Sequence, residues 1–203
     1  MEQSSIGGEY SGRRGPEIPT LPQRRDSGSE TRFHIGVSGA SIGEQAHGFA
    51  VLVDDGQENV LAAITFKSTT AKTTHMRGAL GAALTALEFI DTNCQKDDHV
   101  SVYSSDEYVS KWLKPNIKKW LRDPKRLNKD ILAKIAPLLE RRPEVAFFAG
   151  ADSPSTSLKT HASELAKQAK GGIADHFNDD DELTEEQVNE MLRERALSRD
   201  PWA

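Results

Sequence analysis

The sequence predicts an α/β fold in which a mixed five-stranded sheet is flanked by helices. Two observations support this prediction. Three short strand patterns follow one another in the first third of the chain with turn residues between them, which is typical of an antiparallel meander. The hydrophobic period then changes to that of a helix, and single strands alternate with helices along the rest of the chain. This order favours a sheet with both antiparallel and parallel neighbours and with helices on its faces.

The meander is expected to begin near Phe33. Its second strand ends in the turn signal Asp54-Asp55-Gly56. Two later runs, HVSVYSS and VAFFAG, are short, apolar and bounded by polar or turn residues, and they predict the fourth and fifth strands. The expected strands cover residues 33–41, 48–54, 59–68, 99–105 and 145–150.

Helices are predicted where apolar residues recur every three or four positions. The first begins near Thr74 and places one apolar stripe toward the sheet, formed by Met76, Leu80, Ala83, Leu84, Leu87 and Ile90. Pro115 interrupts the next helical run, which predicts a kink or two short helices. Asn128 is a candidate N-cap for the following helix. The later helices are expected over 108–121, 128–141 and 158–170.

Composition predicts one domain between two tails. The 203 residues carry a net charge of -5. The hydrophobic content of 36% is low for a globular chain, and this deficit lies in the two ends of the chain. Residues 1–31 are rich in Gly, Ser, Pro and charge, so we predict a disordered leader there. The domain is expected over 32–172, followed by an acidic, largely disordered tail over 173–203 in which Thr184 and Gln187 suggest the start of a short helix.

The compartment is expected to be intracellular, either cytoplasmic or associated with a nucleoid or nucleus. Cys94 is the single cysteine, so no internal disulfide is possible. No apolar run approaches the roughly 20 residues of a membrane span, and the first residues lack the apolar core of a secretion signal. We therefore expect no membrane association.

Four segments, in order and at similar spacing, resemble the type-1 ribonuclease H family. They are IGVSGASIG at 35–43, TTHMRGALGAALTALEFI at 73–90, VYSSDEYV at 102–109 and HASELAKQA at 161–169. Trp120 and the step from Asn128 to Asp130 are also similar to the family. The resemblance covers about two thirds of the chain and implies a ribonuclease H-like fold.

The family cleaves the RNA strand of an RNA–DNA hybrid with two Mg²⁺ ions held by four carboxylates. The motifs carry these four positions onto Ser38, Ala79, Ser105 and Ser163, none of which is acidic. Mg²⁺ prefers anionic oxygen ligands, and hydroxyl or methyl groups do not replace them. The resemblance therefore implies a catalytically inactive relative, a pseudoenzyme, without a metal or another cofactor. The loop before the last helix, ADSPSTSLKT, also shows no match to the family's catalytic histidine.

Two acids next to these positions leave one alternative open. Asp106 follows Ser105, and Glu164 follows Ser163. Neighbouring side chains point to opposite faces of a strand and are rotated by about 100° on a helix. We therefore expect both acids to point away from the old metal site.

Two basic groups are candidate nucleic-acid contacts. One surrounds the start of the first helix, where backbone amides favour anions; the other is a basic run with Trp112 and Trp120 interleaved, which suits a phosphate backbone and stacked bases. Ordinary capping, solvated charges and tryptophans in the core explain the same residues without a ligand. The predicted contacts are Lys72, Thr73, Thr74, Arg77, Lys111, Lys118, Lys119 and Arg122.

Two functions remain open on the sequence. The first is a protein-interaction or adaptor module, with an unknown protein partner that the tail could meet through Val188, Met191 and Leu192. The second is a protein that binds an RNA–DNA hybrid or another nucleic acid without cutting it. The net charge favours the first and the local basic run favours the second. An active ribonuclease H would need acids recruited from elsewhere, and the six histidines show no metal-ligand spacing.

Overall fold

The computed structural model describes residues 16, 18–21, 32–42, 46–55, 59–68, 74–154 and 156–167. The predicted contacts Lys72 and Thr73 lie outside these ranges. So does the acidic tail with Val188, Met191 and Leu192. No helix within the described ranges is long and apolar enough to cross a membrane.

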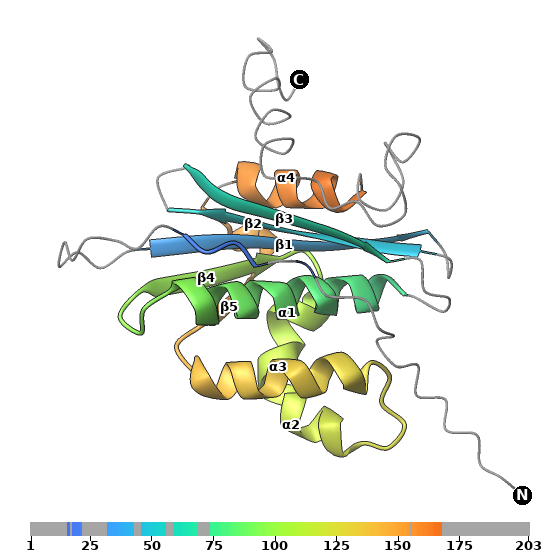
Figure 1. Cartoon of the computed structure of the whole chain (residues 1–203). Helices are drawn as coiled ribbons and strands as arrows, with labels where there is room; N and C mark the ends of the chain where they lie inside the picture. The colour runs from blue at the N-terminus through green and yellow to red at the C-terminus, as the bar shows by residue number, and fades with distance from the viewer. Residues whose placement is uncertain are drawn as a thin grey trace, which may run out of the picture.

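Five strands form one mixed sheet, in the order β3-β2-β1-β4-β5 (Figure 1). The three N-terminal strands pair antiparallel, whereas β4 runs parallel to β1 and β5 runs parallel to β4. The predicted mixed five-stranded sheet is therefore confirmed. The strands are β1 Arg32–Ile42, β2 Ala46–Asp54, β3 Val60–Ser68, β4 His99–Ser104 and β5 Ala146–Ala149.

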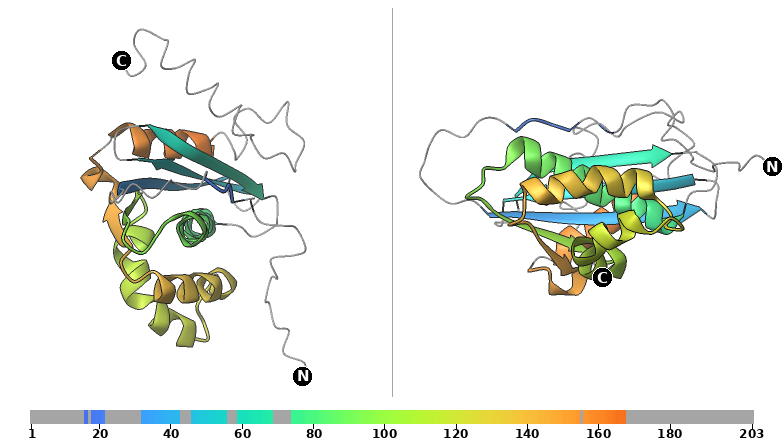
Figure 2. Two further views of the ribbon diagram at one scale, coloured as in Figure 1. Left: turned by 60° about the vertical axis from the view of Figure 1, so that its left-hand side comes forward. Right: turned by 90° about the horizontal axis from the view of Figure 1, so that it is seen from below.

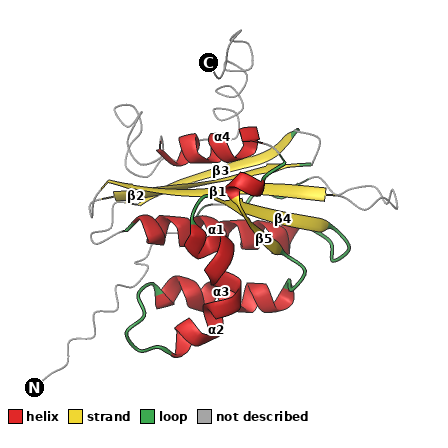
Figure 3. Cartoon of the chain, turned by 180° about the vertical axis from the view of Figure 1, so that it is seen from behind, coloured by secondary structure: helices red, strands yellow, loops and turns green. Residues whose placement is uncertain are grey.

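The helices cover the sheet unequally (Figures 1 and 3). Helix α4 lies on one face, and α1 lies on the other with α3 and α2 stacked beneath it. A π-helix, η1, leads into α2, and a short 3-10 helix, η2, follows β5. The bounds are α1 His75–Asn93, η1 Tyr108–Leu113, α2 Lys114–Arg122, α3 Lys129–Arg141, η2 Gly150–Asp152 and α4 Thr156–Lys167.

The two faces of β1 enter two separate hydrophobic clusters. Ile35 and Val37 belong to the larger cluster, which includes the buried apolar side chains of α1 and α3. Gly36, between them, faces α4, because a Cβ on it would lie 3.1 Å from the side chain of Leu158. The alternation of side chains along the strand thus places one central strand in contact with both helical layers.

Pro115 divides the helical run after β4, as predicted. A proline in an α-helix cannot donate to the carbonyl four residues earlier, and its ring clashes with that carbonyl, here the one of Lys111. The chain is wound as the wider π-helix up to Leu113, and regular α-helix begins at Lys114, with the proline in its first turn. In the first turn a missing backbone donor costs little, because no intrahelical acceptor awaits it.

A short piece of the predicted leader packs against the domain. Ile18 and Leu21 are partly buried on the larger hydrophobic cluster, and Asn93 binds the backbone between them. Residues 18–21, which lie within the predicted leader over 1–31, thus contact the domain. Two apolar side chains separated by a rigid proline give this piece enough buried surface to dock.

Candidate functional site

The four positions that would carry metal-binding acids come from four different elements. Ser38 is in β1, Ala79 in α1, Ser163 in α4, and Ser105 directly follows β4. Strands β1 and β4 are parallel neighbours, and Val37 lies opposite Ser104. Ser38 is the next residue of β1, and Ser105 is the first residue beyond β4, so both follow this pair directly.

Helix α1 meets β1 at this level by direct backbone contact. A Cβ on Gly39 would lie 2.3 Å from the backbone nitrogen of Ala79 and 2.5 Å from the carbonyl carbon of Gly78, so only glycine fits. This contact places Ala79 next to the same part of β1 as Ser38. Ser163 belongs to α4 on the opposite face, where its neighbour Ala162 contacts β1 near Gly36.

The four positions carry small, uncharged side chains. Ser38 is 7% exposed and Ala79 is 2% exposed, whereas Ser105 is open to solvent. None of the four carries a charge that could offset two divalent ions. The described ranges contain no group of three or more His, Cys, Asp or Glu side chains that could hold a metal ion.

Asp106 does not follow the expected strand alternation, because β4 ends at Ser104. Its carboxylate accepts a hydrogen bond from the backbone N–H of Tyr108 at 2.8 Å. It also lies 3.3 Å from Nε2 of His75, in the first turn of α1 and one turn before Ala79. Asp106 therefore contacts the first turn of α1, and its bond to the Tyr108 N–H forms an Asx turn at the start of η1.

Arg77, a predicted phosphate contact, is held within the protein. Its guanidinium donates to both carboxylate oxygens of Asp130, at 3.1 and 2.6 Å, and to Oδ1 of Asn128 at 3.1 Å. Burial alone would raise the pKa of Asp130, but the hydrogen bonds and charge of Arg77 outweigh it and hold this pKa below its ordinary value. Arg77 would have to give up this pair to bind a phosphate.

Asn128 stands at the predicted N-cap of α3 but does not cap it with its side chain. Its backbone is left-handed, with φ 60° and ψ 30°, and no hydrogen bond joins its side chain to the helix amides. Asparagine tolerates this conformation better than most residues. The turn frees the amide oxygen to accept from Arg77.

Thr74 is the N-cap of α1, and its hydroxyl accepts from the backbone N–H of Arg77. Helix capping therefore accounts for Thr74 without a ligand.

Most of the basic run after β4 is engaged with protein groups. Lys111 pairs with Glu107 at 2.5 Å and Lys118 with Glu140 at 3.1 Å. Lys114, not predicted as a contact, donates to the backbone carbonyls of Pro143 and Val145 at 2.7 Å. The exposed Lys119 and Arg122 of α2 have no side-chain partner within the described part of the chain.

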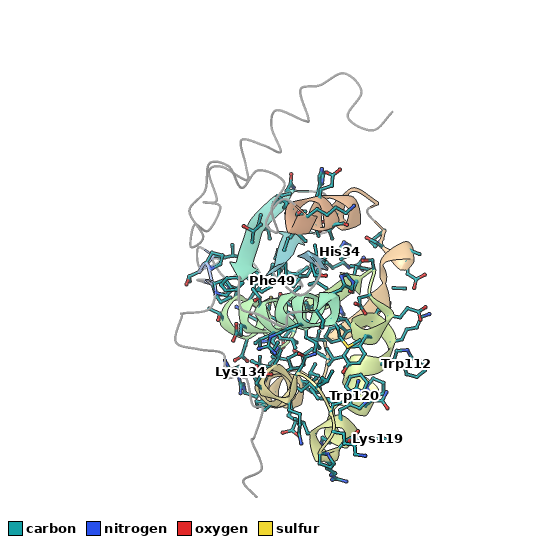
Figure 4. All side chains as sticks on the ribbon, turned by 90° about the vertical axis from the view of Figure 1, so that its right-hand side faces the viewer. His34, Phe49, Trp112, Lys119, Trp120 and Lys134 are labelled. Atoms are coloured by element: carbon teal, nitrogen blue, oxygen red, sulfur yellow. The ribbon has the colours of Figure 1, made fainter. Side chains whose placement is uncertain are left out.

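The aromatic residues of this region form a stack that the sequence did not indicate. The rings of Tyr108 and Trp120 lie 4.3 Å apart and nearly parallel, at 8°. The guanidinium carbon of Arg126 lies 4.1 Å from the centre of the Trp120 ring, and this arginine also donates to the Tyr108 hydroxyl. Figure 4 shows Trp120 near Lys119 on the side of the molecule formed by α2.

The two tryptophans differ in burial. Trp120 is partly buried against the larger hydrophobic cluster, as its core interpretation predicts. Trp112 is 53% exposed, so the same interpretation is wrong for it. The sequence did not indicate that Trp112 would be exposed. It lies in the π-helix, which has more residues per turn than an α-helix, so the α-helical spacing places its side chain wrongly.

No protein-family model and no curated protein sequence matches this chain, but solved structures share its fold. The N-terminal ribonuclease H domain of a Mycobacterium tuberculosis protein is 16% identical, with a TM-score of 0.56 over 72% of this chain and 98% of that one. LC11-RNase H1, isolated from compost and solved with an RNA/DNA hybrid, is 22% identical, with a TM-score of 0.53 over 70% of this chain and 98% of that one. RNase H1 of the archaeon Halobacterium salinarum is 15% identical, with a TM-score of 0.50 over 68% and 96%.

These likenesses cover 68–72% of this chain and nearly the whole of each compared chain. The described part of this chain therefore has a ribonuclease H-like fold, as the resemblance of its sequence implied.

Proposed function

We propose that this protein is a catalytically inactive ribonuclease H-like domain that acts as a protein-interaction module. The loss of catalysis is supported by the side chains at the four positions that match the family's metal-binding carboxylates. Serine and alanine stand where the family's motifs place carboxylates, and two of the four are buried. Without anionic oxygen there is nothing to hold two Mg²⁺ ions close to each other or to activate a water.

Asp106, the acid next to Ser105, does not restore the site by itself. It accepts a hydrogen bond from the Tyr108 N–H and lies beside His75. A carboxylate that accepts a backbone N–H and faces an imidazole offers one metal ligand at most, where the family's chemistry uses four.

A thermal-shift experiment with a matched control tests the loss of metal binding. We expect Mg²⁺ to leave the melting temperature of the full chain unchanged. The control is the variant Ser38→Asp, Ala79→Glu, Ser105→Asp, Ser163→Asp, whose clustered acids repel one another without metal. We expect this variant to melt lower than the natural chain and to recover part of the loss when Mg²⁺ is added.

Cleavage of a labelled RNA–DNA hybrid is the direct assay. We expect no product from the natural chain in Mg²⁺ or Mn²⁺. Metal-dependent cleavage that is removed by both Asp106→Asn and EDTA would overturn the proposal, because it would make Asp106 part of a working site. Cleavage unaffected by that substitution points to a contaminating nuclease, and purification to constant specific activity removes it.

The interaction role rests on charge. The chain carries a net charge of -5, and Lys111, Lys118 and Arg77 are neutralised by Glu107, Glu140 and Asp130. Nucleic-acid affinity depends mainly on cations that can replace the counterions of phosphates. Three of the predicted phosphate contacts are thus paired with acids, and this favours a protein partner.

Nucleic-acid binding without cleavage is the second candidate, and one observation favours it. Lys119 and Arg122 are exposed on α2, close in sequence to the half-exposed Trp112. One of the similar structures, LC11-RNase H1, was solved with an RNA/DNA hybrid.

A fluorescence anisotropy titration with a labelled RNA–DNA hybrid decides between the candidates. If α2 binds phosphates, affinity should fall steeply between 50 and 200 mM salt, and Lys119→Glu with Arg122→Glu should abolish it. The exposed pair Lys96→Glu and Lys167→Glu, both outside α2, serves as a charge-matched control. Absence of binding at 50 mM salt would leave the protein-interaction role as the remaining candidate.

A further inference from the structure

Residues Ile18–Leu21 are bound to the domain as a peptide ligand would be. They lie beside α1, where Figure 2 shows them as a short dark blue segment. The side-chain amide of Asn93, the last residue of α1, makes two hydrogen bonds to their backbone. Its Oδ1 accepts from the N–H of Leu21 at 2.7 Å, and its Nδ2 donates to the carbonyl of Pro19 at 3.0 Å.

This pattern recognises an extended chain. Asn93 contacts a carbonyl and an N–H that are two residues apart, as a neighbouring strand would. The amide is itself oriented by a third hydrogen bond, from Nδ2 to the carbonyl of Phe89 at 3.1 Å. Asn93 is therefore oriented by its own helix as well as by the segment.

Side chains add selectivity to the backbone contacts. Ile18 and Leu21 are both partly buried against the larger hydrophobic cluster, while Thr20 between them is exposed. The sequence of the segment is Ile-Pro-Thr-Leu, followed by Pro22. A residue before proline is restricted to extended conformations, which applies to both anchoring residues, so little conformational entropy is lost on docking.

The segment is a tethered addition to the fold. It pairs with no strand of the sheet and belongs to no helix. Ten residues, 22–31, separate Leu21 from the start of β1 at Arg32. A short tether of this kind raises the local concentration of a ligand to the millimolar range.

We propose that the surface at the C-terminal end of α1, centred on Asn93, is a binding site for extended peptides of the pattern apolar-Pro-X-apolar in a partner protein. Residues 18–21 of the chain occupy this site and compete with the partner. The site lies apart from the old metal positions, so the proposal stands or fails independently of the loss of catalysis.

The first experiment converts the tethered ligand into an exchangeable one. A specific protease site replaces residues 26–29 in the full chain, and the cut protein is titrated with a fluorescein-labelled peptide of residues 16–23, PEIPTLPQ. We expect saturable binding to the cut protein and binding that is weaker by a factor of about ten or more to the uncut protein, because the tether favours the internal segment.

Variants with matched controls test the assigned contacts. Ile18→Ser with Leu21→Ser in the uncut chain should empty the site and allow the labelled peptide to bind. Adding Asn93→Ala to that variant should abolish binding, whereas Asn93→Asp retains the acceptor for Leu21 N–H and should leave partial affinity. A peptide with serine in place of both anchors should not bind.

Two outcomes would overturn the proposal. One is a cut protein, folded by circular dichroism, that does not bind the peptide at millimolar concentration. The other is equal affinity for the natural and the serine-substituted peptides, because it would show that the site does not recognise the side chains of Ile18 and Leu21. Since neither assay measures cleavage or metal binding, a failure here says nothing about the proposed loss of catalysis.

Discussion

The pair of Arg77 and Asp130 shows how a residue that resembles a ligand contact can serve the fold. The side chains are 15% and 29% exposed, and the guanidinium binds both carboxylate oxygens. A bidentate ion pair of this kind is stronger than a single hydrogen bond and depends on the planar guanidinium group of arginine. The contact joins the first turn of α1 to the first turn of α3.

We predict that Arg77→Ala lowers the free energy of unfolding by about 1–3 kcal/mol, because Asp130 is left without its partner in a half-buried position. Arg77→Lys should recover only part of this loss, since one ammonium cannot reach both carboxylate oxygens and Asn128 together. Urea unfolding measures the effect. A double-mutant cycle with Asp130→Ala should give a clear coupling energy, and strict additivity would contradict the prediction.

At the scale of elements, α1 and β1 are joined by a contact between backbones. Gly39 faces the peptide bond between Gly78 and Ala79, with no room for a Cβ. Gly81, one turn further along α1, faces a side chain instead, since a Cβ there would lie 2.8 Å from the Phe49 ring. Phe49 is itself stacked on Phe66 at 5.3 Å.

We predict that Gly39→Ala destabilises the protein by about 3 kcal/mol or more, because relieving the overlap requires α1 to move away from the sheet. Gly81→Ala is the matched control in the same layer. It should cost clearly less, since a ring can shift and alanine gains about 1 kcal/mol of helix propensity over glycine. Thermal unfolding of the two variants compares them, and equal losses would show that the close approach at Gly39 is not decisive.

At the scale of the whole molecule, two ion pairs connect α1 to α3, one near each end of the two helices. Arg77 and Asp130 join the first turns, and Asp91 and Arg141 join the last turns, at 2.6 Å in each pair. The hydrogen bond from Arg141 lowers the pKa of Asp91, and the pKa of Asp130 is lowered as well. Glu88 lies on α1 between these two ion pairs. Burial raises its pKa, and the charge of Lys134 partly offsets this shift.

We predict that stability falls with acid below the ordinary aspartate pKa of 3.8. Both aspartates bind protons less readily in the folded than in the unfolded chain, so their contribution is present above pH 3.8 and is lost as the pH falls through their folded pKa values. Glu88 acts in the opposite direction, because the cost of its buried charge disappears as the pH falls through its raised pKa.

Urea midpoints measured between pH 7 and pH 2.5 test this profile. Asp91→Asn with Asp130→Asn should lower stability at neutral pH and flatten the acid-induced drop. Glu88→Gln should leave the drop in place while removing any gain near pH 4.5. An unchanged drop in the double variant would assign the acid sensitivity to other carboxylates.

The sequence alone determined the order of strands and helices, the meander, the break at Pro115 and the absence of acids at the four motif positions. These features depend on residues close together in the chain, since period, turn residues and motif spacing are local properties. Only the tertiary structure decided what the polar residues do. Arg77 meets Asp130 across 53 positions, and Asn93 meets Leu21 across 72. Partners so distant in sequence leave no local pattern, because each pair forms only when two separate elements pack together, and neither element's own sequence indicates its partner.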